Sequence, residues 1–297
     1  MKKRNLLTIG MMLLVAADCM GQKGNIKVDV TSKGKVSASD TLSFRAIHFS
    51  DSLIADMKII DYSSDEEPYP FTMGKSRNYY EAYTLEAVGG RPEVVAFINQ
   101  WLLCNQANRS IRPPVGAETV AEKYAELKAE GLGDMNSVLK SVSRRFLEED
   151  LLEESSFETG NQHYNGISVV MNTPNVLTIL DHGSNYAAGA AHGMPWGFLV
   201  TFDLKNLRQL MFDDIISEEG REAVLEMIVE DLRENYGEEG LTDAIDFPGC
   251  DPALTEEGVQ FNYQSYEIGP YSMGMPTVVV PYEKIRKYLT PQVRALL

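Results

Sequence analysis

The sequence predicts an α+β protein in which mainly antiparallel sheets pack against helices in two lobes. Predicted strands occur in groups before and after the predicted helices, whereas a doubly wound parallel sheet needs strands and helices in regular alternation. No internal repeat of about 20 to 50 residues is evident, which argues against solenoids and propellers. The apolar fraction of 44% is sufficient for a real core in a chain of 297 residues.

Residues 1–21 have the pattern of a secretory signal peptide. Residues 2–4 are basic, and the mostly apolar run 6–17 is shorter than the about 20 residues that cross a bilayer. Cleavage is expected after Gly21, so the protein is predicted to be exported and either periplasmic or secreted. The alternative is lipidation at Cys19, although an acidic residue precedes it where lipoprotein signals carry a small one. No later stretch predicts a transmembrane helix.

The rest of the chain is predicted to form a linker (22–40), an N-terminal α+β lobe (41–160) and a C-terminal α+β domain (161–297). Without the signal peptide, 24 basic and 42 acidic residues remain, a net charge of −18. This charge disfavours nucleic acid and anionic membranes as partners, and it would attract a cationic protein such as lysozyme. Solubility is the simpler explanation for most of it.

In the N-terminal lobe, predicted strands precede predicted helices. Pro92 stands at a favourable first helical position, and apolar residues repeat at helical spacing over 94–102. Apolar residues over 120–127 and 135–146 indicate two more helices. The predicted strands are 44–49, 57–62 and 79–88.

The C-terminal domain is predicted to begin with a hairpin. Strands 165–172 and 175–181 flank a turn at Thr173 and Pro174. Ser217 is the expected N-cap of a later helix, because its hydroxyl could accept a backbone N–H at the helix start. The remaining predicted elements are strand 197–204, helix 217–234, strand 277–280 and a short helix from Pro281 to Leu289.

The predicted mature chain holds two cysteines, Cys104 on a helix and Cys250 in a loop. In an oxidising compartment they could form a disulfide that joins the two halves. A buried thiol at Cys104 is the alternative. The sequence has no CxxC motif and no Cys/His spacing typical of a metal site, so we expect no cofactor and no metal.

His182 and His192 are the residues most suited to acid–base or metal chemistry. A turn at Gly189 could bring them together, and Asp181 and Asp203 are the nearest carboxylates. The sequence contains neither HExxH nor a nucleophile elbow, which favours hydrogen-bonded structural histidines. The glycines predict that residues 189–193 lie in a turn or bulge.

Aromatic residues form the candidate ligand-binding surfaces. Exposed Tyr and Trp rings stack on sugars or fill a protein interface, whereas buried rings build core. The candidate ligand-binding residues are Tyr186, His192 and Trp196 in one segment and Tyr263, Tyr266 and Tyr271 in another.

The C-terminal 115 or so residues resemble a known domain. The matching segments are 186–193, 201–204, 211–214, the helix after Ser217, 261–274 and 278–282. They resemble a domain of unknown function in bacterial envelope proteins, which also forms the lysozyme-recognising extracytoplasmic sensor of the anti-sigma-V factor. Residues 40–175 could correspond to the partner domain that often precedes it. The resemblance implies an α+β fold and an extracytoplasmic place, and it supplies no catalytic residues.

These observations predict a non-catalytic binding module of the cell envelope for a protein or glycan ligand. A sigma-regulatory role is not expected, because a cleavable signal stands where that sensor has a sigma-binding segment and a transmembrane helix. One alternative is an enzyme acting on envelope polymers, a hydrolase or metal-assisted enzyme that uses His182, His192 and Asp203. The other is a lysozyme-binding protein.

Overall fold

The computed structural model describes residues 41–107, 116–237 and 240–297. The predicted signal peptide, the candidate lipidation site Cys19 and the predicted linker lie outside the described residues. Within the described ranges, no helix has both the length and the apolar character needed to cross a membrane.

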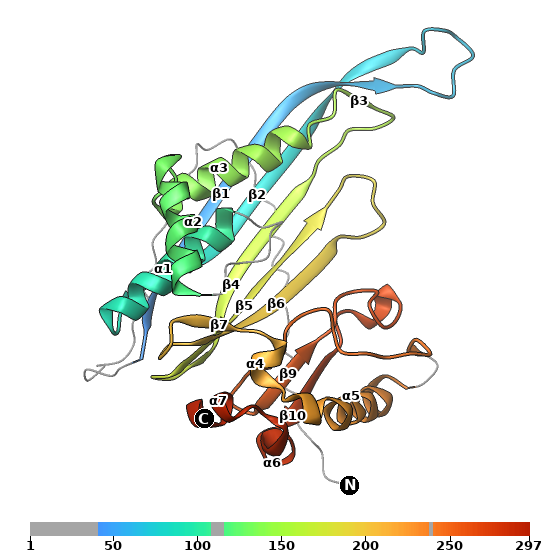
Figure 1. Cartoon of the computed structure of the whole chain (residues 1–297). Helices are drawn as coiled ribbons and strands as arrows, with labels where there is room; N and C mark the ends of the chain where they lie inside the picture. The colour runs from blue at the N-terminus through green and yellow to red at the C-terminus, as the bar shows by residue number, and fades with distance from the viewer. Residues whose placement is uncertain (1–40, 108–115, 238–239) are drawn as a thin grey trace.

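A seven-stranded sheet forms the centre of the fold, with the order β3-β1-β2-β4-β5-β6-β7 (Figure 1). Neighbouring strands are antiparallel except for the pairs β1–β3 and β2–β4. The predicted α+β fold with mainly antiparallel pairing is confirmed. The strands are β1 (Ser43–Ile60), β2 (Phe71–Gly89), β3 (Glu154–Ser155), β4 (Gln162–Asn172), β5 (Val176–Tyr186), β6 (Met194–Asp203) and β7 (Arg208–Leu210).

The hairpin of β1 and β2 is longer than the sequence pattern predicted. Segments 44–49 and 57–62 were expected to be separate strands, but β1 runs without interruption from Ser43 to Ile60. Residues 50–56 alternate between exposed and half-buried positions while the backbone stays paired with β2. Ser50, Ser52 and Asp56 are on the exposed side. The tip of this hairpin projects beyond the other strands (Figure 1).

Three helices cover one face of the large sheet. The fully buried Trp101 stands edge-on against Phe202 of β6, with ring centroids 4.9 Å apart, and Phe97 packs on the same ring. Asp134 caps the third helix by accepting a hydrogen bond from the Ser137 N–H at 3.0 Å. The helices are α1 (Pro92–Ala107), α2 (Ala117–Ala129) and α3 (Met135–Glu149), close to the predicted positions.

A second layer of structure gathers at one end of the large sheet (Figure 1). It combines a three-stranded antiparallel sheet, in the order β10-β9-β8, with short helices and the longer α5. The strands are β8 (Ala253–Leu254), β9 (Gly258–Asn262) and β10 (Thr277–Pro281). The helical elements are α4 (Phe212–Ile215), η1 (Glu218–Gly220), α5 (Arg221–Tyr236), η3 (Tyr271–Met273), α6 (Tyr282–Ile285), η4 (Arg286–Tyr288) and α7 (Pro291–Leu296).

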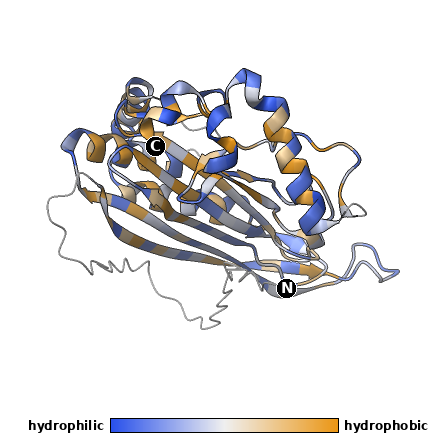
Figure 2. Cartoon of the chain, turned by 90° about the horizontal axis from the view of Figure 1, so that it is seen from below, coloured by the Kyte–Doolittle hydropathy of each residue, from blue (hydrophilic) through white to orange (hydrophobic). Residues whose placement is uncertain are grey.

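This C-terminal layer covers only part of the face that α1–α3 leave free. The Thr178 hydroxyl donates to the Leu254 carbonyl at 2.7 Å, and the Leu254 N–H donates to the Thr201 hydroxyl at 3.1 Å. The next residue on each strand, Ile179 and Phe202, belongs to the core under the helices, so the two layers occupy opposite faces. Hydrophilic and hydrophobic residues alternate along the long strands (Figure 2). Among the described residues, no helix covers the same face over β1 and β2, where Tyr83 is exposed.

Two predictions about the C-terminal elements need correction. Ser217 was expected to cap the long helix, but it precedes the 3-10 turn η1, and its side chain makes no capping hydrogen bond there. The helix itself begins at Arg221. The predicted helix 281–289 is two short elements, α6 and η4, and Thr290 caps the unpredicted α7 by accepting from the Val293 N–H at 3.3 Å.

The predicted boundary at 160/161 lies between two strands of one sheet. Tyr79 of β2 pairs in parallel with Gln162 of β4, which joins the segments before and after this point.

Cys104 and Cys250 are not bonded to each other. Cys104 is buried in α1, with its sulfur 3.9 Å from the Val120 carbonyl, and Cys250 lies before β8 near Gln264. The disulfide considered from the sequence is therefore absent.

Candidate functional site

The glycine-rich segment forms the loop between β5 and β6, so the predicted turn is confirmed. Gly189 has φ +83°, a left-handed conformation that favours glycine. A Cβ at this position would also lie 2.6 Å from the Phe157 ring. Glycine is required here for both reasons, and the loop leads His192 back toward β6.

His192 is held between two tyrosines of the C-terminal layer. Its ring stacks on Tyr271, with centroids 3.6 Å apart and an interplanar angle of 15°. His192 Nδ1 and the Tyr271 hydroxyl donate to the same acceptor, the Gly193 carbonyl, at 3.1 and 2.8 Å. In the neutral ring this leaves Nε2 as an acceptor, and the Tyr266 hydroxyl lies 3.1 Å from it. We call these three residues, His192, Tyr266 and Tyr271, the loop cluster.

Tyr266 is the exposed member of the loop cluster. Its φ is +69°, an uncommon backbone conformation for a residue with a bulky side chain, and 52% of the residue is exposed. Strained conformations of this kind often mark ligand-contacting positions. The Glu267 carboxylate braces the turn by accepting from the backbone N–H groups of Gln264 and Gly249, each at 2.6 Å. These hydrogen bonds stabilise the turn that holds Tyr266 in its uncommon backbone conformation.

The other predicted ligand-binding residues are not members of the loop cluster. Tyr263 is buried, and its hydroxyl donates to the Asp246 carbonyl at 2.7 Å, so it belongs to the core. Burial raises the pKa of Tyr263 above its ordinary value. Trp196 packs across Gly183 and beside Phe198, with ring centroids 5.7 Å apart. Tyr186 is half-buried at the end of β5.

The residues of the predicted enzyme site have separate environments. His182 lies on β5, with Nε2 3.5 Å from the Ser168 hydroxyl, whereas His192 belongs to the loop cluster. Asp203 is buried and accepts from the backbone N–H groups of Lys205 and Asn206, at 3.0 and 3.1 Å. Among the described residues, no three His, Cys, Asp or Glu side chains are grouped to hold a metal ion.

A second cluster, which the sequence did not reveal, lies on the open face of the large sheet. The His48 and Tyr83 rings stack with centroids 4.4 Å apart and an interplanar angle of 11°. Both contact one oxygen of Glu81: His48 Nε2 and the Tyr83 hydroxyl are each 2.9 Å from Oε1. Tyr164 of β4 continues the row, 5.9 Å from the Tyr83 ring. We call His48, Glu81, Tyr83 and Tyr164 the sheet-face cluster.

His182 extends this row onto a fourth strand. Its ring centroid is 5.9 Å from that of Tyr164, and it lies over Gly166, where a Cβ would be 2.6 Å from its Cε1 atom. Opposite His182 in the β5–β6 pair, Gly197 leaves room for Met275 of the C-terminal layer. The layer that carries Tyr266 and Tyr271 therefore borders the face that carries the sheet-face cluster.

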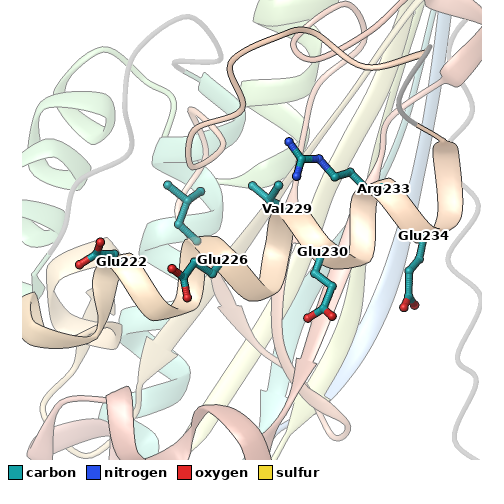
Figure 3. Close-up of a pocket in the computed structure, with 7 residues that line it drawn as sticks. Glu222, Glu226, Val229, Glu230, Arg233 and Glu234 are labelled. Carbon is teal, nitrogen blue, oxygen red and sulfur yellow. The ribbon is translucent and has the colours of Figure 1, made fainter.

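A shallow depression of about 690 Å³ lies along α5 (Figure 3). Its lining includes Arg233 and four glutamates spaced four residues apart on α5, so the charge of the depression is mainly negative. The residues drawn in Figure 3 belong to one helix, and this arrangement is typical of a solvated acidic helix face. Its lining residues are Glu222, Leu225, Glu226, Val229, Glu230, Arg233 and Glu234.

The stretch from α4 to the start of α6 thus builds most of the C-terminal layer and carries two of the three loop-cluster residues. Residues 213–283 match DUF3298, a protein family of unknown function. This match covers a minority of the chain. It supports the resemblance at the level of DUF3298, and the likeness to the anti-sigma-V sensor stays a prediction. A comparison with curated proteins gave no match.

Two solved structures of DUF3298 family members are similar to the chain. The member from Bacteroides fragilis is 20% identical, with a TM-score of 0.52; the match covers 84% of this chain and 94% of that one. The member from Pseudomonas aeruginosa is 16% identical, with a TM-score of 0.48, and the match covers 82% and 95%. At this identity the first likeness concerns the fold alone, which extends well beyond the DUF3298 segment.

Proposed function

We propose that this protein is a non-catalytic binding module of the cell envelope, and that the loop cluster contacts its ligand. The observation that carries this proposal is the stacking of His192 on Tyr271 beside the exposed Tyr266. Tyrosine offers a large apolar ring together with a hydroxyl, which suits contacts with a protein or a glycan.

The geometry of the loop cluster supports a binding role because its rings are already ordered. The stack and three hydrogen bonds fix the rings of His192 and Tyr271 before any ligand arrives. A preorganised surface loses less conformational entropy on binding, so more of the contact energy contributes to affinity. Export belongs to the same proposal, and it is supported by the basic and apolar pattern of residues 1–21.

The proposal is tested by affinity capture from solubilised cell envelope with the mature chain immobilised. Tyr266→Ala and Tyr271→Ala should each reduce recovery of the captured protein or glycan by about tenfold or more, the range for central aromatic contacts. Tyr236→Ala is a matched control, because Tyr236 is an exposed tyrosine on α5. Equal recovery with all three variants would refute a role for the loop cluster.

A cationic protein such as lysozyme is one candidate ligand. The net charge of −16 for the full chain would attract a basic protein at long range and raise its association rate. The resemblance to a lysozyme-recognising sensor favours the same ligand. Because charge attraction alone is unspecific, the salt dependence of binding distinguishes recognition from simple attraction.

A further inference from the structure

We propose that the sheet-face cluster is a binding site for an organic ammonium group. The site consists of the Glu81 carboxylate and the neighbouring rings of His48, Tyr83 and Tyr164. It shares no residue with the loop cluster, so this inference stands or falls separately from the proposed function.

The pairing of the strands fixes this arrangement. His48 of β1 lies directly opposite Tyr83 of β2, and Glu81 lies beside Tyr164 in the parallel register of β2 and β4. Residues two apart on a strand share a face, so Glu81 and Tyr83 project together. Side chains on three adjacent strands are thereby held on one rigid platform.

The carboxylate is only partly used by the protein. His48 and Tyr83 both contact Oε1, and no bond to Oε2 is seen among the described residues. The Glu81 side chain is 44% exposed and that of His48 31%. Over the described part of the chain, Glu81 has no Lys or Arg within ion-pair distance; Lys75, six residues earlier on β2, is paired with Asp56. One carboxylate oxygen is therefore available to a cationic ligand.

The rings leave room for that ligand on one side. The His48 ring, from β1, stacks on one face of Tyr83. Tyr164 lies on β4, the strand on the other side of β2. The rings of Tyr83 and Tyr164 are tilted by 50°, and 43% of Tyr83 is exposed. Two tilted rings over an open face form a wedge, with the carboxylate beside it.

Rings and a carboxylate together select a cation. The faces of aromatic rings carry partial negative charge, which attracts an ammonium group within about 6 Å of the ring centroid. The carboxylate adds a charge-assisted hydrogen bond for a primary amine and Coulomb attraction for a quaternary one. Anions are repelled by the same groups. Burial, followed by the bond to Glu81 and the charge of Glu81, raises the pKa of Tyr83 to about 12.

The test is an NMR titration of the mature chain labelled on its tyrosine rings. The probe is tetramethylammonium chloride, with sodium chloride varied in opposition so that ionic strength stays constant. Saturable shifts confined to the sheet-face tyrosines are expected. tert-Butanol, a neutral molecule of similar shape, should give none. Shifts that do not saturate, or equal shifts with tert-butanol, would overturn the proposal.

Variants and a second pair of probes complete the test. Glu81→Gln should weaken tetramethylammonium binding by about tenfold, and Tyr83→Phe, which keeps the ring, should change it less than threefold. Tyr266→Ala should leave the titration unchanged, which separates this site from the loop cluster. Undiminished binding to Glu81→Gln, with its fold verified by circular dichroism, would refute the carboxylate's role. Choline and N-acetyl-lysine amide then distinguish a quaternary from a primary ammonium as the preferred group.

Discussion

Tyr271 and His192 share one acceptor, the carbonyl oxygen of Gly193, while their rings stack at 3.6 Å. The two residues are 79 positions apart in the chain. This contact therefore ties the β5–β6 loop to the C-terminal layer. Because Tyr271 contacts both His192 and the loop backbone, changes to Tyr271 should affect stability as well as ligand capture.

Tyr271→Phe should lower the free energy of unfolding by about 0.5–1.5 kcal/mol, because it removes one hydrogen bond and keeps the stack. Tyr271→Ala should cost more, since the stacked ring is lost too. Urea unfolding of both variants measures the effect, with Tyr236→Phe on the exposed part of α5 as the control. An unchanged midpoint for Tyr271→Phe would show that its hydroxyl bond adds nothing to stability.

Gly183→Ala should destabilise the fold by about 1–3 kcal/mol, the usual cost of an overpacked interior. A Cβ at Gly183 would overlap the Tyr164 carbonyl oxygen and the Trp196 ring. Gly249→Ala is the matched control, because its Cβ would meet only the Glu267 carboxylate at 3.6 Å. Thermal unfolding of the two variants should differ clearly; equal transitions would contradict the packing of Trp196 on β5.

The two thiols should make stability fall at alkaline pH. Burial raises the pKa of Cys104 and of Cys250 to about 11. Their ordinary value is about 8.5, so between about 8.5 and 11 the unfolded chain releases protons that the folded chain keeps. Their contribution to stability is thus complete below about pH 8.5 and is lost as the pH rises toward 11. Urea midpoints from pH 7.5 to 10 should decline, and a Cys104→Ala, Cys250→Ala variant should decline less.

Titration against lysozyme tests the cationic ligand. Association should be fast at low salt and slower at about 0.15 M, where charges are screened beyond about 8 Å. Specific recognition by the loop cluster should survive at that ionic strength and weaken in Tyr266→Ala. Complete loss of binding near 0.15 M would mean unspecific charge attraction. Succinylated lysozyme, which lacks the positive charges, is the matched control ligand.

Much of the fold could be predicted because its signals are local. The apolar stripe around Trp101 predicted α1, and the turn at Thr173 and Pro174 predicted the β4–β5 hairpin. The glycines predicted the β5–β6 loop that carries His192. Each of these signals depends on residues a few positions apart, which is the range over which periodicity and turn chemistry act.

The sheet-face cluster could not be predicted in the same way. Alternation along β2 places Glu81 and Tyr83 on one face, and this signal was present in the sequence. The partners His48 and Tyr164 depend on the register between strands, which links Glu81 to Tyr164 across 83 positions. No local pattern encodes that register.

The tyrosines of the C-terminal layer show a second limit. Tyr263 and Tyr266 occur in the same aromatic segment, and its composition does not distinguish them. Tyr263 continues the inward alternation of β9, whereas Tyr266 lies in a turn with a positive φ and is exposed. The alternation from Val259 through Phe261 could have identified Tyr263 as a core residue.

The core beneath the C-terminal layer has a consequence for how such proteins are divided. The detected DUF3298 segment, 213–283, shares its core with Met171 and Val176 before it and with Leu289 and Val293 after it. If that segment were excised, it would lose these contacts and expose an apolar surface, and we expect it not to fold by itself. The stretch that sequence comparison detects is therefore shorter than the stretch that shares this core.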